Sequence, residues 1–418
     1  MIPFYSPELE KGTFLRIIKG LFKGDIYNGA EIERFEKDFA KYINTKYAIT
    51  FASGRYALYL AYKFFGCDKK RIVLPSYTCI PAIDASRWAC AEPYFLDIDL
   101  SYYNPRFNSS LNRLSNIGAV SLSYLYGLIG DIKPFLKFAK EKEIPLIEDS
   151  AIALGAMYNN KKAGSLGDAA VFSLQSSKII TAWKGGVITT NNKELYGWLK
   201  EERKKQINPP TLKLIFNCYI TYLRKICSNR LLYKCTMKPL KDMASSRYIG
   251  GLTEKLIDQN PIEAINGKSP KKMPASEKFR FTNLQALLAL PSFEKIDKII
   301  KRRREMAKIL AEELKSKPNI KFPSERKGAK NAYGRFPVRI EGENKYDIQK
   351  KLSMKGIEVS LNYPYIIPQT QYMKKYNLDK KMYPNAVKAS KETFILPFHT
   401  GLKNEEIAYM AKSIKEIA

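Results

Sequence analysis

The sequence has only one histidine among 418 residues, and its six cysteines include no C-x-x-C pair. Because zinc sites are built mainly from clustered cysteine and histidine side chains, we expect no zinc site of this kind and predict no metal ligands. No stretch approaches 18 consecutive apolar residues, and the N-terminus MIPFYSPELEKG lacks the basic start and apolar core of a secretory signal. These absences predict a protein of the reducing cytosol without a membrane-spanning helix.

Acidic residues are scarce relative to basic ones: 41 Asp and Glu stand against 71 Lys and Arg, which gives a net charge of +30. Such a charge attracts phosphate groups on nucleotides, nucleic acid or anionic lipid, and selects none of them. About a third of the excess lies between residues 203 and 247, where eleven Lys or Arg accompany one acid, Asp242. Inside it, residues 212–234 mix aromatic, aliphatic and basic side chains. They suit a helix at a membrane surface or, as we favour, a helical insertion docked on the protein itself.

The length and the order of apolar segments predict the fold class. Hydrophobic residues make up 45% of the chain, and 418 residues exceed the usual size of a single core, so two domains are expected. Apolar strands alternate with helices and are predicted at 47–51, 71–75, 93–99, 118–127 and 145–149. This alternation predicts an α/β fold with a parallel sheet covered on both faces. We predict a large domain over 1–285, with a basic helical insertion at about 203–275, and a small α+β domain over 286–418.

One lysine, Lys178, stands inside the otherwise apolar run FSLQSSKIITAWKGG, although lysine is rarely buried without a partner. A desolvated lysine loses its proton more readily and can attack a carbonyl. The turn ASGRYAL at 52–58 joins a strand to a helix, where free backbone N–H groups can hold a phosphate. LIEDS at 146–150 ends a strand in two adjacent acids. Each feature alone is common, but a phosphate cradle, an acid at a strand end and a semi-buried lysine together are what pyridoxal phosphate needs.

Ten motifs follow one another in a recognisable order and spacing over nearly the whole chain apart from about 203–275. They are GAEIERFEKDFAKYI, SGRYALYLA, VLPSYTC, YFLDID, IEDSAIALGA, GSLGDAAVFSLQSSK, GGVITTN, RFTNLQALLAL, GIEVSLNYP and ILPFHTGL. Through them the sequence resembles the pyridoxal-phosphate-dependent sugar aminotransferases of the DegT and StrS type, and the segment from IEDSA to GGVITTN is the most specific part. The resemblance implies the type I transferase fold, with a mostly parallel sheet flanked by helices in the large domain.

The resemblance also implies roles for individual residues. Lys178 corresponds to the lysine that bonds to the aldehyde of pyridoxal phosphate and shuttles protons. Asp149 corresponds to the partner of the pyridine nitrogen. The residues that correspond to contacts of the phosphate group are Gly54, Arg55, Tyr56 and Ser173.

Several positions depart from the family's pattern. Arg55 replaces the usual threonine of the phosphate turn and could supply a charged donor in its place. Cys79 stands where many relatives place an aromatic residue against the cofactor ring, and Ile152 stands where glutamine or histidine is common. Lys278 stands where relatives have an asparagine that reaches the phosphate of the other subunit. The substrate region departs as well, and the residues predicted there are Tyr27, Asn362 and Tyr363.

The activity implied by the resemblance is transfer of an amino group from glutamate to a keto group of a nucleotide-activated sugar, for cell-surface polysaccharide or glycoconjugate synthesis. Sugar dehydratases of the same group carry histidine at the lysine position, so Lys178 favours transamination. A homodimer is implied because relatives build each site from two subunits. We expect a cytoplasmic protein without a nucleic-acid partner, whose residues 203–247 could contact an anionic membrane at its inner face. The alternative is a catalytically altered or silent relative that acts as a basic membrane- or nucleic-acid-binding protein.

Overall fold

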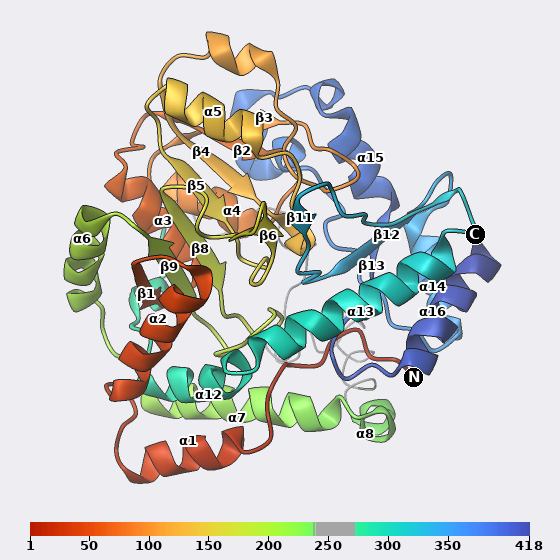
Figure 1. Ribbon diagram of the computed structural model, residues 1–418, viewed down its shortest axis with the longest axis horizontal. Coiled ribbons are helices and arrows are strands. Elements are labelled where there is room, and N and C mark those ends of the chain that lie inside the picture. The colour runs from red at the N-terminus through yellow and green to blue at the C-terminus, as the bar shows by residue number, and fades with distance from the viewer. Residues whose placement is uncertain (237–238, 240–271) are drawn as a thin grey trace.

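The computed structural model describes every residue except 237–238 and 240–271, so much of the predicted insertion at about 203–275 lies outside the described residues. At its centre is a seven-stranded sheet in the order β1-β9-β8-β5-β4-β2-β3 (Figure 1). β9 pairs antiparallel with both neighbours, whereas the other neighbouring pairs are parallel. The predicted α/β fold with a mostly parallel sheet is therefore confirmed. The strands are β1 (Tyr47–Phe51), β2 (Arg71–Pro75), β3 (Glu92–Leu96), β4 (Ile117–Ser123), β5 (Leu146–Asp149), β8 (Ala169–Ser173) and β9 (Gly186–Thr190).

Helices cover both faces of this sheet because successive residues of a strand point to opposite sides. On β2, Ile72 and Leu74 join one apolar cluster and Val73 joins the other. Residues of α3, α4 and α6 belong to the first cluster, and residues of α2 and α5 belong to the second. Burial on both faces explains why the strands are nearly continuous apolar runs. These helices are α2 (Ala30–Ile43), α3 (Gly54–Phe64), α4 (Ile80–Trp88), α5 (Lys133–Glu141) and α6 (Lys193–Lys204).

The C-terminal part of the chain forms a smaller α+β unit beside the sheet (Figure 1). Its three strands run antiparallel in the order β10-β12-β13, and a second small sheet pairs β11 with the β6-β7 hairpin of the large unit. The strands are β6 (Met157–Tyr158), β7 (Lys161–Lys162), β10 (Ile320–Lys321), β11 (Ala329–Lys330), β12 (Phe336–Ile340) and β13 (Thr393–Leu396). The helices of this unit are α14 (Lys345–Met354), α15 (Pro384–Glu392) and α16 (Asn404–Ile417). Short 3-10 helices are η1 (Ser109–Arg113), η2 (Leu125–Gly127), η3 (Ala275–Lys278), η4 (Ile367–Gln369), η5 (Gln371–Tyr376) and η6 (Lys380–Met382).

Two consecutive helices connect the large and small units. α12 (Asn283–Phe293) is buried along its whole length, and the predicted domain boundary after residue 285 falls inside it. α13 (Ile296–Leu314) starts in the core under the large sheet with Ile300 and ends among residues of the small unit with Leu310. Since one helix serves both cores, the division into two domains stays a prediction.

A buried ion pair fixes the N-terminal segment to α13. Glu8 Oε1 lies 3.0 Å from Arg303 Nη2, and the two side chains are 5% and 3% exposed. Thr400 donates its backbone N–H, at 3.0 Å, and its hydroxyl to the same carboxylate. Burial raises the pKa of Glu8, but the Arg303 charge and the Thr400 hydrogen bonds outweigh this effect and leave the pKa below its ordinary value. The ion pair therefore stabilises the fold at pH values where Glu8 is ionised and is lost as the pH falls through the lowered pKa.

The described part of the basic insertion folds back on the protein. It forms α7 (Thr211–Cys227) and α8 (Arg230–Cys235), and α7 lies beside α12 and α1 (Thr13–Phe22) (Figure 1). Leu214 and Cys218 of α7 are fully buried in a cluster with residues of α12 and α1, and the rings of Tyr222 and Phe14 stack at 5.1 Å. The prediction of a docked helical insertion is confirmed for α7. In the described part of the chain, no helix combines the length and the apolar character needed to cross a bilayer.

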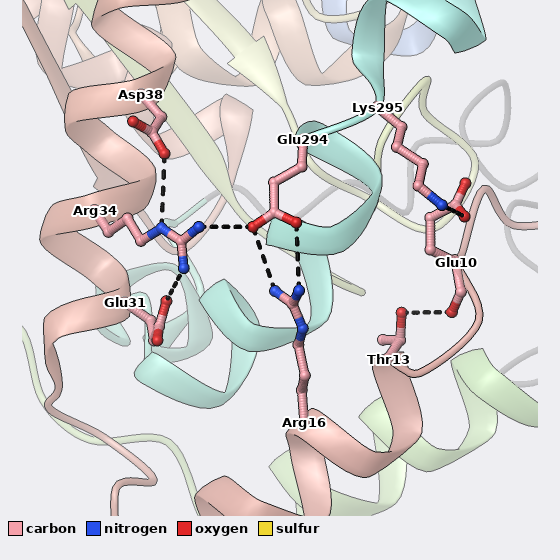
Figure 2. Close-up of polar contacts among 8 residues, drawn as sticks. All are labelled: Glu10, Thr13, Arg16, Glu31, Arg34, Asp38, Glu294 and Lys295. Carbon is pink, nitrogen blue, oxygen red and sulfur yellow. Dashed lines mark hydrogen bonds and ion pairs between the residues drawn. The ribbon is translucent and has the colours of Figure 1, made fainter.

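Surface ion pairs hold α1 and α2 against the end of α12. Figure 2 shows Glu294 between two arginines, Arg16 of α1 at 3.3 Å and Arg34 of α2 at 2.8 Å. Nearby, Lys295 Nζ lies 2.5 Å from Glu10 Oε2. Partly exposed pairs of this kind contribute about 0–1 kcal/mol each. Their main effect is to hold α1, which packs against α7, in a fixed position.

Candidate active site

A cavity of about 600 Å³ opens where β4, β5 and β8 end and where α3 and α4 begin. This is the edge at which ligands bind in open α/β sheets, and the volume falls within the range of about 300–1,000 Å³ common for small-molecule sites. Nine of the predicted site residues line the cavity: Gly54, Arg55, Cys79, Asp149, Ile152, Ser173, Lys178, Asn362 and Tyr363. Residues far apart in the sequence thus meet in one place.

Asp149 is the last residue of β5, and its carboxylate is 8% exposed at the cavity wall. Ser123 Oγ donates to Oδ2 at 3.1 Å, and the Ala151 N–H donates to Oδ1 at 3.2 Å. Burial raises the pKa of Asp149, and these hydrogen bonds together with the charge of Lys178 oppose the rise. The two hydrogen bonds hold the carboxylate in one orientation, and it interacts electrostatically with Lys178.

The neighbouring acid, Glu148, points to the other side of the strand. It is fully buried and accepts three backbone N–H groups, from Gly164 at 2.8 Å, Leu166 at 2.7 Å and Gly167 at 2.8 Å. Glu148 therefore anchors the turn before β8 and is absent from the cavity lining. Of the two adjacent acids in the sequence, the structure places Asp149 in the cavity.

Lys178 lies in a folded loop between β8 and β9. The loop is closed by backbone hydrogen bonds, among them Ala182 N–H to Leu174 O at 2.9 Å and Ser176 N–H to Trp183 O at 3.0 Å. Its apolar residues, such as Ile179, are buried, while the Lys178 side chain is half-buried and lines the cavity. The apolar sequence around the lysine thus builds a loop that directs one amine into the cavity.

The turn before α3 has the geometry of an anion cradle. Ser53 caps the helix by accepting the Tyr56 N–H at 3.1 Å, and the N–H groups of Gly54 and Arg55 have no acceptor inside the helix. A Cβ on Gly54 would lie 3.2 Å from Ser173 Cβ, so this turn and the end of β8 approach closely. Helix N-termini with free N–H groups favour phosphate.

Glycine is required where the cradle crosses β9. A Cβ added to Gly186 would lie 2.4 Å from the carbonyl carbon and oxygen of Ser53, which no side chain can tolerate. The Gly185-Gly186 pair that follows the lysine loop therefore lets the phosphate turn sit directly on the sheet. Lysine, carboxylate and cradle consequently face one volume, and this donor set fits pyridoxal phosphate.

Two of the departures from the family pattern acquire a structural context. Arg55 Nη1 lies 3.0 Å from Asp84 Oδ2 of α4, and Arg87 lies 3.5 Å from the other oxygen of the same buried carboxylate. The charge of Arg55 is thus balanced before any phosphate binds. Burial and the Asp149 carboxylate raise the pKa of the Cys79 thiol despite the opposing charge of Lys178.

Three predicted residues are not part of the cavity lining. The Tyr56 side chain is buried in the core behind the turn, and its backbone N–H donates to the Ser53 hydroxyl that caps α3. The Tyr27 hydroxyl donates to Pro209 O at 3.0 Å, so this side chain packs against the segment that leads into α7. Lys278 is exposed and is absent from the cavity lining, although its neighbour Glu277 belongs to it. The predicted roles of these residues stay predictions.

Sequence reasoning missed several residues that line the cavity. Lys184 Nζ lies 3.3 Å from Glu277 Oε1, and Glu277 also accepts a hydrogen bond from Ser53, the cap of the cradle. Arg335, the residue directly before β12, also lines the cavity and is 8% exposed. Six residues of α7 line it as well, and their spacing of three or four positions in the sequence was the available signal. Among the described residues, no group of three His, Cys, Asp or Glu side chains gathers as metal ligands would.

Comparison with known proteins gives a consistent result. The model of the DegT/DnrJ/EryC1/StrS aminotransferase family matches residues 8–207 and 259–415. The chain is 25% identical over 421 residues to a GDP-perosamine synthase of Escherichia coli O157:H7, covering 99% of this chain and 98% of that protein. It is 26% identical to the dTDP-3-amino-3,6-dideoxy-alpha-D-galactopyranose transaminase of Aneurinibacillus thermoaerophilus, covering 92% and 90%.

Solved structures share the fold. The putative sugar aminotransferase Spr1654 from Streptococcus pneumoniae, in its PMP form, superposes with a TM-score of 0.78 at 18% identity over 100% of this chain and 99% of that chain. PseC of Helicobacter pylori, an aminotransferase involved in the biosynthesis of pseudoaminic acid, superposes with a TM-score of 0.76 at 20% identity, covering 99% and 98%.

Proposed function

Because the chain belongs to the DegT/DnrJ/EryC1/StrS aminotransferase family, we propose that it moves an amino group from glutamate to a keto group of a nucleotide-activated sugar. Relatives named for such reactions on GDP-, UDP- and dTDP-linked sugars support this substrate class, and a similar spore coat polysaccharide biosynthesis protein supports a role in polysaccharide synthesis. The cofactor is pyridoxal phosphate. The observation that carries the proposal is the meeting of Asp149, Lys178 and the N-terminus of α3 in one cavity.

The roles of the residues follow from their positions. Bound in this cavity, pyridoxal phosphate supplies an aldehyde that can carry an amino group and a ring that withdraws electrons. Asp149, fixed by Ser123 and Ala151, would keep a proton on the ring nitrogen of the bound cofactor. Lys178 Nζ takes a proton from one carbon of the bound substrate and returns it to another atom, as a general base and then a general acid. The Ser173 hydroxyl and the first N–H groups of α3 hold the phosphate.

A colour test examines the role of Lys178. The purified protein with pyridoxal phosphate is expected to show an absorption band near the visible range that borohydride removes, and peptide mapping should then find the cofactor on Lys178 and not on Lys184. Lys178→Ala is expected to lose this fixation and to lower transamination by about 10²- to 10⁴-fold, the usual contribution of a positioned acid–base group. Fixation on another residue, or full activity of the variant, contradicts the assignment.

A substrate screen examines the reaction itself. Incubation with glutamate should convert the cofactor to its amino form, and a set of 3-keto and 4-keto nucleotide sugars should then restore the original absorption with formation of an amino sugar. A protein that takes up the cofactor but reacts with neither glutamate nor any keto sugar favours the alternative of a catalytically silent relative.

We also propose a homodimer. Lys278 is exposed and lies outside the cavity of its own subunit, as expected for a residue that reaches a neighbouring site. Sedimentation equilibrium is expected to give twice the mass of the chain, and Lys278→Ala is expected to weaken cofactor binding without changing the oligomer. A monomer with full activity contradicts this proposal.

A cytoplasmic location at the inner face of an anionic membrane is the remaining part of the proposal. α1 and α7 lie side by side and expose Phe22 by 89%, Leu212 by 84% and Leu15 by 61%. Lys19 and Lys23 at the end of α1 are exposed as well. Apolar side chains flanked by cations suit attachment to acidic lipids. Flotation with phosphatidylglycerol vesicles should recover the protein at low salt, whereas Phe22→Ser with Leu212→Ser should not float. Equal recovery of both proteins, or none of either, contradicts attachment through this face.

A further inference from the structure

Helix α7 forms a large part of the cavity wall, although it lies outside the residues matched by the family model. The match ends at residue 207 and resumes at 259, and α7 spans Thr211–Cys227. Six of its residues line the cavity: Lys213, Phe216, Asn217, Ile220, Thr221 and Arg224. This wall is therefore a feature that the family pattern does not supply.

These six residues form one side of the helix. They recur at intervals of three or four positions, which places them on a single face. Arg224 follows Lys213 by eleven positions, so the stripe is about 16 Å long at a rise of about 1.5 Å per residue. Leu214 and Cys218 are buried against α12 and fix the rotation of α7 about its axis. The stripe is thus held rigidly toward the cavity.

The charge of the cavity exceeds what the cofactor alone requires. Its lining holds two acids, Asp149 and Glu277, and six cations, which are Arg55, Lys178, Lys184, Lys213, Arg224 and Arg335. Arg55 is paired with Asp84 and Lys184 with Glu277, while the cradle at α3 already provides for one phosphate. Within the described part of the chain, Lys213 pairs with no acid. Lys213 therefore brings to the cavity a positive charge that neither a described acid nor the phosphate of the cofactor neutralises.

An aromatic ring and an amide stand beside Lys213. Phe216 lines the cavity and is 57% exposed, so its ring offers a face to a planar group. Asn217 Nδ2 donates to the Lys213 carbonyl at 2.6 Å, which orients its Oδ1 as an acceptor. A cation, an aromatic face and an amide acceptor within one helical turn match the phosphates, the base and the polar edge of a nucleoside diphosphate.

We propose that the cavity-facing side of α7 binds the nucleoside diphosphate part of the amino acceptor. Lys213 and Arg224 contact its phosphates, and the ring of Phe216 stacks on its base. The inference rests on the proposed function and deepens it, because it assigns recognition of the activated sugar to a helix outside the residues that the family model matches.

Direct binding measurements test the assignment. Calorimetric titration of the full-length protein loaded with pyridoxal phosphate uses UDP, GDP, ADP and dTDP in turn. We expect at least one of them to bind, and we expect Lys213→Ala and Phe216→Ala each to raise its Kd at least tenfold. The matched controls are Lys225→Ala and Tyr219→Ala, which remove the same kinds of side chain from α7 outside the cavity lining, and they should stay within twofold of the unchanged protein.

Kinetics separate this inference from the proposed function. The Lys213 and Phe216 variants should raise KM for a keto nucleotide sugar at least tenfold while the glutamate half-reaction stays within twofold. Unchanged Kd and KM overturn the inference, and so does equal loss of both half-reactions, which would make α7 a support of the cofactor site. A protein that binds a nucleoside diphosphate through Lys213 but aminates no keto sugar refutes the proposed function and leaves the binding assignment in place.

Discussion

Exchange of each of the two adjacent acids on β5 should separate chemistry from stability. Asp149 faces the cavity, whereas Glu148 is buried on the other side and accepts three backbone N–H groups. Asp149→Asn keeps the shape of the side chain but removes its negative charge from the cavity wall. Loss of one oriented electrostatic group in a site shielded from water typically costs about 10²–10³ in kcat. For Asp149→Asn we expect a loss of kcat of this size together with an unchanged midpoint of unfolding.

Glu148→Gln should have the opposite signature. The amide oxygen can keep the bonds from Leu166 and Gly167, which both go to Oε1 at 2.7 and 2.8 Å. The amide nitrogen then faces the Gly164 N–H, which donates to Oε2 at 2.8 Å, so two donors meet in a buried place. An unsatisfied buried donor costs about 1–3 kcal/mol, and loss of charge-assisted hydrogen bonds adds about 1 kcal/mol. The expected loss of about 2–4 kcal/mol is large against a total of about 5–15 kcal/mol.

Urea unfolding followed by circular dichroism measures the stability of both variants, and the glutamate half-reaction measured on folded protein gives the chemical rate. An Asp149→Asn variant that keeps more than a tenth of the rate contradicts a chemical role for this carboxylate. A Glu148→Gln variant that unfolds at the same urea concentration as the unchanged protein contradicts a stabilising role for Glu148.

Two further pairs of variants test the fold. Glu8→Gln should lower the free energy of unfolding by about 3–5 kcal/mol, because it leaves the buried charge of Arg303 unpaired, whereas Glu10→Gln at the surface should lower it by about 0–1 kcal/mol. The difference between the two variants should shrink as the pH falls through the lowered pKa of Glu8. Equal unfolding midpoints of the two variants at pH 7 would contradict this expectation. Gly186→Ala should abolish pyridoxal phosphate binding, because its Cβ would meet the cradle backbone at 2.4 Å. Gly197→Ala, in an open position of α6, should stabilise the protein by about 0.5–1 kcal/mol. Fluorescence titration with the cofactor measures binding by the Gly186 variant, and thermal melts measure the stability of the Gly197 variant. Tight cofactor binding by Gly186→Ala would contradict the assignment of the phosphate cradle.

Much of the architecture was predictable because it depends on local pattern. The strand at 145–149 and the turn at 52–58 each follow from a run of apolar residues and a small-residue turn within a few positions. Parallel strands end at one edge, so Asp149 and the cradle had to lie near each other. The candidate site could be predicted to this extent from periodicity and motif spacing.

Other features could not be predicted, because they depend on pairs of residues far apart in the chain. The balance of Arg55 by Asp84 requires α3 and α4 to pack side by side, and the burial of Tyr56 depends on which face of α3 meets the sheet. Glu277 reaches Ser53 across more than two hundred residues. No local pattern encodes such contacts.

The sequence by itself determined the fold class and the residues predicted to hold the cofactor, since both depend on short-range periodicity and on ordered motifs. Only the tertiary structure decided that Glu148 is an anchor, that Glu8 is paired with Arg303, and that α7 closes the cavity. The physical reason is that burial, charge pairing and the direction in which a helix faces are set by packing between distant segments. Local sequence patterns do not specify which distant segments pack together, and so they do not specify these features.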